Sequence, residues 1–364
     1  MNGVPVDTGI IRPAAGTGMP RGRSARRRTG RVQEITSEVA RLRIAIVNVF
    51  FVGAPDAGDG EWTLVDAGLP GSAGRIRRAA EERYGSGTRP AAIVLTHGHF
   101  DHVGALRELA EWWNVPIYAH TRELPYLTGR SAYPPPDPGV GGGAMAAMSW
   151  IFPRGPVDLE GRVRPLPEDG SVPGMPGWSW LETPGHTAGH VSLFRESGRV
   201  LIAGDAFVTQ KQESLTGALT QAPMVHGPPA YFTPDWESAE QSVQRLAALQ
   251  PEIVATGHGL PLRGAEMRDA LTTLSLHFRQ LAVPRTGRYV GAPARADEHG
   301  VTWIPPEPPA SDRVRTLTLG VAALLGGALA LSVASGGGER SRRSGPRDRG
   351  WRPPRPRLSE SASR

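Results

Sequence analysis

Three histidines and one aspartate lie within six residues of each other, in the string His97-Gly98-His99-Phe100-Asp101-His102. The apolar run 91–96 directly before them is predicted to form a short buried strand. Because side chains two positions apart at the end of a strand point the same way, His97 and His99 can bind one metal ion together. Asp101 and His102 begin a predicted helix and can turn toward a second ion. Imidazole and carboxylate groups are common zinc ligands, so this spacing predicts a metal site.

Three more predicted strand ends each carry one candidate ligand next to a glycine. The strings that contain them are Thr183-Pro184-Gly185-His186-Thr187, Ala203-Gly204-Asp205 and Thr256-Gly257-His258-Gly259. Glycine lets the backbone pass close to a metal ion and adds no side chain that would block it. We therefore expect His186, Asp205 and His258 to join the first group.

With these residues the sequence resembles the metallo-β-lactamase superfamily over about residues 32–300, and within it the glyoxalase II-like and lactonase-like hydrolases. The resemblance implies an α/β fold, a four-layer αββα sandwich with the metals at one edge between two similar halves. For the first metal it implies the ligands His97, His99 and His186. For the second it implies Asp101, His102 and His258, with Asp205 bridging both. It also implies that Asp66 lies just outside the ligands, although Asp66 could equally cap a turn.

The reaction implied by the resemblance is hydrolysis by a binuclear zinc site. Two zinc ions lower the pKa of a water between them, so that hydroxide is available near neutral pH. This hydroxide would attack the carbonyl of an ester, thioester or lactone, a small-molecule acyl substrate. The resemblance makes Asp101 the catalytic residue that orients the water. Iron or manganese are the alternative metals.

Two other classes of function compete with this interpretation. A mononuclear iron persulfide dioxygenase would share the ligand strings but bind a single metal ion. A membrane-tethered binding protein without catalysis would be expected to lack part of the ligand set, whereas here the set is complete. Metal analysis distinguishes the first alternative from a binuclear hydrolase.

The chain contains no cysteine, which excludes a disulfide framework, a thiolate nucleophile and a Cys-bearing metal site. Zinc β-lactamases that use a cysteine ligand are therefore a poorer match than other members. Leu281–Pro309 is short and rich in proline and glycine where glyoxalase II has a helical substrate domain, which counts against glutathione thioesters.

The positive charge is concentrated at the two ends of the chain. Residues 1–31 hold seven arginines and one acidic residue, and residues 339–364 hold nine arginines and three. Because the whole chain carries only +6, residues 32–338 carry −6. A body that binds nucleic acid along a groove would normally be basic, so we expect no nucleic-acid partner.

The predicted organisation has four parts: a disordered tail 1–31, a catalytic domain 32–310, a transmembrane helix within 316–338 and a disordered tail 339–364. Residues 316–334 are mostly apolar and long enough to span a bilayer. The arginines that follow would place the catalytic domain outside the cell. Residues 1–31 contain no apolar signal-peptide core, however, so we expect a cytoplasmic catalytic domain, anchored by this helix or free. No pattern predicts the oligomeric state.

The pattern of apolar residues predicts two groups of strands interleaved with helices. Single strands are expected over 43–53 and 61–66, and helices over 101–113 and from Thr233, as N-cap, to about Leu249. Residues 128–156 form a loop too long for a plain connection, which predicts a lid or binding loop. The side chains that could build an apolar lid are Tyr133, Met145, Met148, Trp150, Phe152, Tyr231 and Phe232.

The other five histidines carry weaker expectations. His120 and His226 could line the site, or they could have no role in it. His190 is predicted to make a structural hydrogen bond, and His277 and His299 to be structural or exposed.

Overall fold

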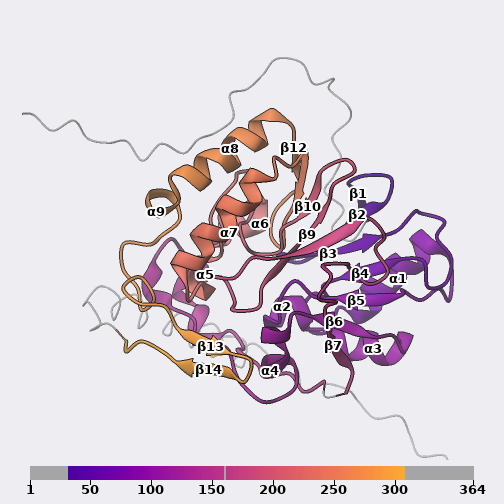
Figure 1. The fold of residues 1–364 in the computed structure, drawn as a ribbon, viewed down its shortest axis with the longest axis horizontal. Coiled ribbons are helices and arrows are strands. Elements are labelled where there is room, and N and C mark those ends of the chain that lie inside the picture. The colour runs from indigo at the N-terminus through magenta and orange to yellow at the C-terminus, as the bar shows by residue number, and fades with distance from the viewer. Residues whose placement is uncertain (1–31, 160, 308–364) are drawn as a thin grey trace, which may run out of the picture. The chain divides into compact units, whose positions relative to one another are not determined.

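The structure is a computed structural model that describes residues 32–159 and 161–307 of the chain. Its N-terminal half forms a seven-stranded sheet with the strands in sequence order, and its C-terminal half a five-stranded sheet in the order β12-β11-β10-β9-β8 (Figure 1). The first sheet consists of β1 (Gln33–Glu34), β2 (Val39–Ile44), β3 (Val47–Val52), β4 (Thr63–Val65), β5 (Ala92–Val94), β6 (Ile117–Ala119) and β7 (Val163–Pro165). The second consists of β8 (Trp178–Glu182), β9 (Val191–Arg195), β10 (Val200–Ile202), β11 (Ile253–Ala255) and β12 (Leu262–Arg263). A separate hairpin pairs β13 (Arg295–Asp297) with β14 (Gly300–Trp303).

The helices lie on the outer faces of the two sheets (Figure 1). In the N-terminal half the helices are α1 (Ala73–Tyr84), α2 (Phe100–Val103), α3 (Leu106–Trp113), α4 (Leu124–Leu127) and α5 (Ala144–Ala147). In the C-terminal half they are α6 (Leu215–Thr220), α7 (Trp236–Ala248), α8 (Ala265–Leu276) and α9 (Phe278–Leu281). Short 3-10 turns are η1 (Thr121–Glu123), η2 (Pro138–Val140), η3 (Ser149–Ile151) and η4 (Ala230–Phe232).

Alternation of apolar residues along the strands produces the four layers. On β3, Val49 and Phe51 pack on the side of α1 and α3, whereas Phe50 faces the opposite side, as expected for a period of two residues. Phe50 shares a buried cluster with Leu193 and Ile202 of the second sheet, so the two sheets pack face to face. The other face of the second sheet packs against α7 and α8. The predicted α/β sandwich is thereby confirmed.

Three predicted elements differ from the structure. The single strand expected over 43–53 is the hairpin β2–β3, which turns at Ala45 with a positive φ of 52°. The helix expected over 101–113 is divided into α2 and α3 at Gly104, whose amide donates to the Gly68 carbonyl oxygen at 2.7 Å and not to the preceding turn of the helix. The N-cap of α7 is Asp235, not Thr233, since its side chain accepts a hydrogen bond from the Ser238 amide at 3.0 Å.

The predicted transmembrane helix within 316–338 and the tails 1–31 and 339–364 lie outside the described residues. Within 32–307, no helix is long and apolar enough to cross a membrane.

The packing between the sheets predicts a large loss of stability for Leu193→Ala. Leu193 is fully buried between the sheets, and removing such a side chain lowers the free energy of unfolding by about 2–5 kcal/mol. The control is Leu276→Ala on α8, where the side chain is 73% exposed and the expected change is within about 0.5 kcal/mol. Denaturant titrations of both variants measure the difference. Equal losses would contradict the face-to-face core.

Candidate metal centre

Loops that follow four strands bring the candidate ligands to one edge of the sandwich. The loop between β5 and α2 carries His97 and His99, and α2 itself carries Asp101 and His102. The loops after β8, β10 and β11 carry His186, Asp205 and His258 respectively. All seven side chains are buried. The structure thus gathers every predicted ligand from both halves of the chain, and their role as ligands stays a prediction.

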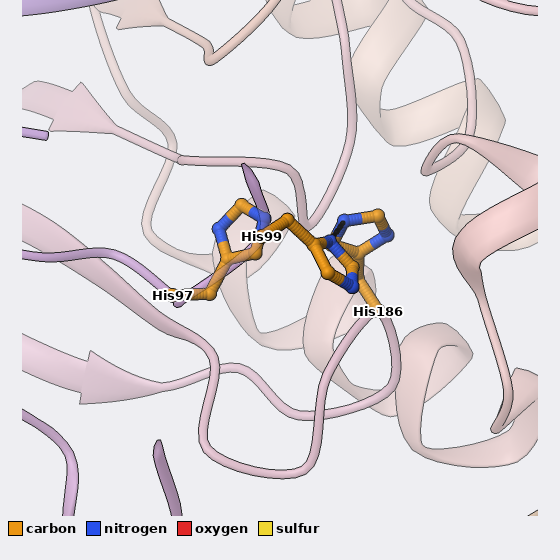
Figure 2. A group of neighbouring side chains, drawn as sticks. All are labelled: His97, His99 and His186. Carbon is orange, nitrogen blue, oxygen red and sulfur yellow. Dashed lines mark hydrogen bonds between the residues drawn. The ribbon is translucent and has the colours of Figure 1, made fainter. Parts of the chain in front are cut away.

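The first group consists of His97, His99 and His186, whose ligand atoms all lie within 4.8 Å of one another. Figure 2 shows these three imidazoles close together, and His99 Nδ1 lies 3.0 Å from His186 Nε2. Three nitrogen donors at this spacing fit around one divalent transition-metal ion.

Asp101, His102 and His258 form a second group, and His97, His102 and Asp205 a third that overlaps both. The Asp205 Oδ2 atom lies at the centre of the arrangement. It is 3.1 Å from His258 Nε2, 3.5 Å from His186 Nε2 and 3.6 Å from His102 Nε2. One carboxylate oxygen therefore lies within reach of imidazoles from both predicted metal sites.

Several ligand atoms are buried without a hydrogen-bond partner. They are Nε2 of His97, Nε2 of His102 and Oδ1 of Asp205. Buried polar atoms are normally paired, and leaving one unpaired costs about 1–3 kcal/mol. A metal ion bound to these atoms would remove that cost, so the residues present fit the predicted cofactor.

The surroundings keep most of the imidazoles in the neutral form that binds metal. Burial and the neighbouring histidines lower the pKa of His99 to about 3 and hold the pKa values of His97 and His186 well below the usual value. Burial also lowers the pKa of His102, but the carboxylates of Asp66, Asp205 and Asp101 outweigh it and raise that pKa well above the usual value. A metal ion at Nε2 of His102 would take the place of this proton.

Residues behind the ligands set their orientation. Asp66 Oδ2 lies 2.8 Å from His102 Nδ1, and Asp66 Oδ1 accepts a hydrogen bond from the Thr96 amide at 2.8 Å. His258 Nδ1 lies 2.8 Å from the carbonyl oxygen of Ile46, which leaves Nε2 facing the site. Such outer contacts fix the ring and its tautomer. Asp66 therefore lies immediately behind a predicted ligand, as the resemblance implied.

His190 makes the structural hydrogen bonds expected of it. Its Nε2 accepts from the Asp205 amide at 2.9 Å, and its Nδ1 lies 2.8 Å from Thr183 Oγ1. His120 Nε2 lies 3.4 Å from Glu182 Oε1, and His226 Nε2 lies 3.8 Å from Glu213 Oε2.

The close approach of the backbone to two candidate ligands explains why residue 257 is a glycine. A Cβ atom at Gly257 would collide with Asp205 Oδ1 and would lie 2.7 Å from His102 Cε1. No other residue fits there without moving a ligand.

Five of the seven side chains predicted to build a lid cluster beside the ligands, and their role as a lid stays a prediction. Met145, Tyr231 and Phe232 form a buried cluster on which Phe100, Met148 and Phe152 pack. The Phe232 ring stacks on His99 with a centroid distance of 4.6 Å. Trp150, in contrast, is 50% exposed.

Glu123 is a buried residue that the sequence analysis missed. Its Oε2 accepts hydrogen bonds from the Gly98 amide at 2.9 Å and from the Tyr133 hydroxyl. Its Oε1 accepts from Thr187 Oγ1 at 2.7 Å and from the Gly189 amide at 3.0 Å. No local pattern distinguishes Glu123 from an ordinary charged turn residue, because its partners are distant in the sequence.

Sequence comparison with known proteins identifies the family of this chain. The model of the metallo-beta-lactamase superfamily matches residues 43–258. The chain is 49% identical over 248 residues to the probable metallo-hydrolase YflN of Bacillus subtilis, which covers 68% of this chain and 94% of that protein. It is 29% identical over 253 residues to hydroxyacylglutathione hydrolase of Cereibacter sphaeroides, which covers 69% and 74% respectively. A solved beta-lactamase domain protein from Burkholderia ambifaria aligns at 22% identity and a TM-score of 0.48, over 69% of this chain and 77% of that one. The chain belongs to the metallo-beta-lactamase superfamily, as one of its metal-dependent hydrolases.

Proposed function

We propose that the protein is a binuclear hydrolase, with zinc as the expected metal, that cleaves an ester, thioester or lactone. The position of Asp205 Oδ2 carries this proposal, since it lies within 3.6 Å of imidazole nitrogens from both predicted metal sites. A carboxylate between two sets of ligands is the arrangement that a bridging ligand requires.

His97, His99 and His186 would hold the first ion, and Asp101, His102 and His258 the second. When bound there, two divalent ions lower the pKa of a water between them and polarise a carbonyl oxygen. Asp101 lines the space above the ligands together with Asp205 and His258. Its Oδ2 atom lies 3.4 Å from His258 Nε2, where it can orient a water molecule or accept a proton from it. The aromatic lid over this space keeps bulk water out.

The second group of ligands is as complete as the first. Asp101, His102 and His258 are buried like the first group, and Asp66 holds His102 in place. A mononuclear iron dioxygenase would share these residues, so the number of bound metal ions distinguishes the two functions. The similarity to hydroxyacylglutathione hydrolase supports an acyl substrate of small-molecule size.

The bridging position of Asp205 leads to a prediction about metal content. The purified protein is expected to carry about two transition-metal ions per chain, mainly zinc, and Asp205→Ala to lose much of both because one carboxylate serves two sites. Elemental analysis after removal of loosely bound metal measures this. The exposed His299 provides a control, since His299→Ala should retain the full content. One tightly held iron ion without a second metal would replace this proposal with the dioxygenase.

The position of Asp101 leads to a prediction about catalysis. Asp101→Ala is expected to lower kcat for ester or thioester hydrolysis by about 10²–10⁴-fold, the usual contribution of a positioned acid or base. His99→Ala should cause a loss of similar size through the first metal site, whereas His299→Ala should leave kcat unchanged. Circular dichroism checks that each variant is folded. Undiminished turnover in Asp101→Ala would exclude the water-orienting role.

A further inference from the structure

A cavity of about 270 Å³ borders the candidate metal centre. His99 and Phe232 line both this cavity and the smaller space above Asp101, Asp205 and His258. His186 of the first ligand group also lines the larger cavity. A molecule in it would therefore lie directly beside the predicted reaction centre.

The walls of this cavity are largely apolar. Tyr126, Tyr133, Phe232 and Tyr289 line it together with several prolines. The Tyr133 hydroxyl donates to Glu123, and the Tyr289 hydroxyl donates to the Pro135 carbonyl oxygen at 2.6 Å. These two hydroxyls are already used, so their rings offer mainly apolar surface to a ligand.

The charged residues at the cavity do not change its apolar character. Asp235 caps α7, and its two oxygens accept hydrogen bonds from the Ser238 amide and hydroxyl at 3.0 and 2.7 Å. Arg122 and Arg295 are exposed to solvent.

The β13–β14 hairpin builds one wall of the cavity with Ala294, Arg295 and Ala296. This hairpin lies beyond residue 258, where the family match ends. It is attached to the body by the Ala294 amide, which donates to the Pro234 carbonyl oxygen at 3.0 Å, and by the Val301 amide, which donates to Ser131 Oγ at 3.1 Å. The small alanine side chains leave the space open. An element outside the matched region thus limits the width of the cavity.

We propose that this cavity binds a compact apolar or aromatic group of the substrate, and that the β13–β14 hairpin sets the size of group that fits. The inference rests on the proposed hydrolysis of esters or thioesters. Chemically, the group could belong to the acyl part or to the leaving group, and both share the same apolar recognition.

Narrowing the cavity with Ala296→Trp tests this proposal. With thioesters or esters that carry a phenylbutyryl group, KM is expected to rise about tenfold or more, as expected for a pocket that no longer accepts its group. The corresponding acetyl compounds should be unaffected, and the metal content should stay the same. Thr302→Trp, at an exposed position on the same hairpin, is the matched control. It should leave the KM for the phenylbutyryl compounds and the KM for the acetyl compounds unchanged. A second series with a small acyl group and a bulky alcohol or thiol shows which part of the substrate occupies the cavity.

A binding measurement separates this inference from the proposed function. The ketone 5-phenylpentan-2-one carries the same phenylalkyl group as the phenylbutyryl compounds but cannot be hydrolysed, and its affinity is expected to fall about tenfold or more in Ala296→Trp. One outcome is that the wild type binds the ketone, and Ala296→Trp binds it more weakly, while the wild type hydrolyses neither esters nor thioesters. That result would refute the proposed function and support the subsite. Equal ketone binding by the wild type and Ala296→Trp would refute the subsite.

The buried carboxylate of Glu123 carries a second, independent inference. It is hydrogen-bonded to Gly98, between His97 and His99, and to Thr187, directly after His186. It therefore joins the two loops that carry the first group of ligands.

Glu123 also contacts the long loop 128–156 through Tyr133, whose ring lies 4.6 Å from that of His99. We infer that Glu123 is a positioning residue that holds the three imidazoles at the spacing the first metal ion requires.

Glu123→Gln tests this role, because each carboxylate oxygen accepts a hydrogen bond from a backbone amide, Gly98 or Gly189, and in either orientation the glutamine NH₂ cannot accept one of them. Metal affinity in the first site is expected to fall about 10–100-fold, as for other residues that orient ligands. Chelator competition measures the affinity, and the visible spectrum of the cobalt-substituted protein reports the ligand geometry. Tyr133→Phe keeps the hydrogen bond from the Gly98 amide to Glu123. It should therefore change the metal affinity and the cobalt spectrum less than Glu123→Gln does.

A purely structural role would lower Tm but leave the metal affinity and the cobalt spectrum of the folded variant unchanged, and that result would overturn the inference. If Glu123→Gln does not fold, Thr187→Val removes one of the four hydrogen bonds and should still weaken binding by a measurable factor. Unchanged affinity and spectrum in Thr187→Val would then count against the inference.

Discussion

The contact of Asp205 Oδ2 with three imidazoles joins the two halves of the chain at the site. His102 belongs to the N-terminal half, whereas His186 and His258 belong to the C-terminal half. A buried side chain holds the halves in this register, since Asn48 Nδ2 donates to the carbonyl oxygens of Thr256 and Gly259 at 2.8 Å. The ligand geometry therefore depends on the face-to-face packing of the sheets.

The meeting of the candidate ligands at one edge could be predicted from the sequence because they lie in short strings at or just after strand ends, and their role as ligands stays a prediction. Glu123 could not, since its partners Gly98 and Thr187 are 25 and 64 residues away and only the folded chain brings them together. The same reason accounts for the break between α2 and α3, where the Gly104 amide donates to Gly68, a residue distant in the sequence, and this contact overrides local helical preference. The turn at Ala45 lacks the glycine or proline that usually marks such a position.

The long loop 128–156 serves two sides of the site. Tyr133, Pro134 and Pro135 line the apolar cavity, whereas Met145 and Phe152 cover the space above the ligands. Phe232, from η4, separates these two spaces and stacks on His99. Phe232 lines both spaces, so a substrate that occupied both of them would contact this ring.

Because the ligands come from both halves, the native fold is the form that offers all seven at once, and metal binding and folding are thermodynamically linked. A ligand that binds only the folded state adds stability that grows with its free concentration, about 2.7 kcal/mol at a hundredfold excess over Kd. The supply of metal would then determine how long a newly made chain survives proteolysis. A shortage of the cofactor would raise the unfolded fraction of the chain, which proteases degrade.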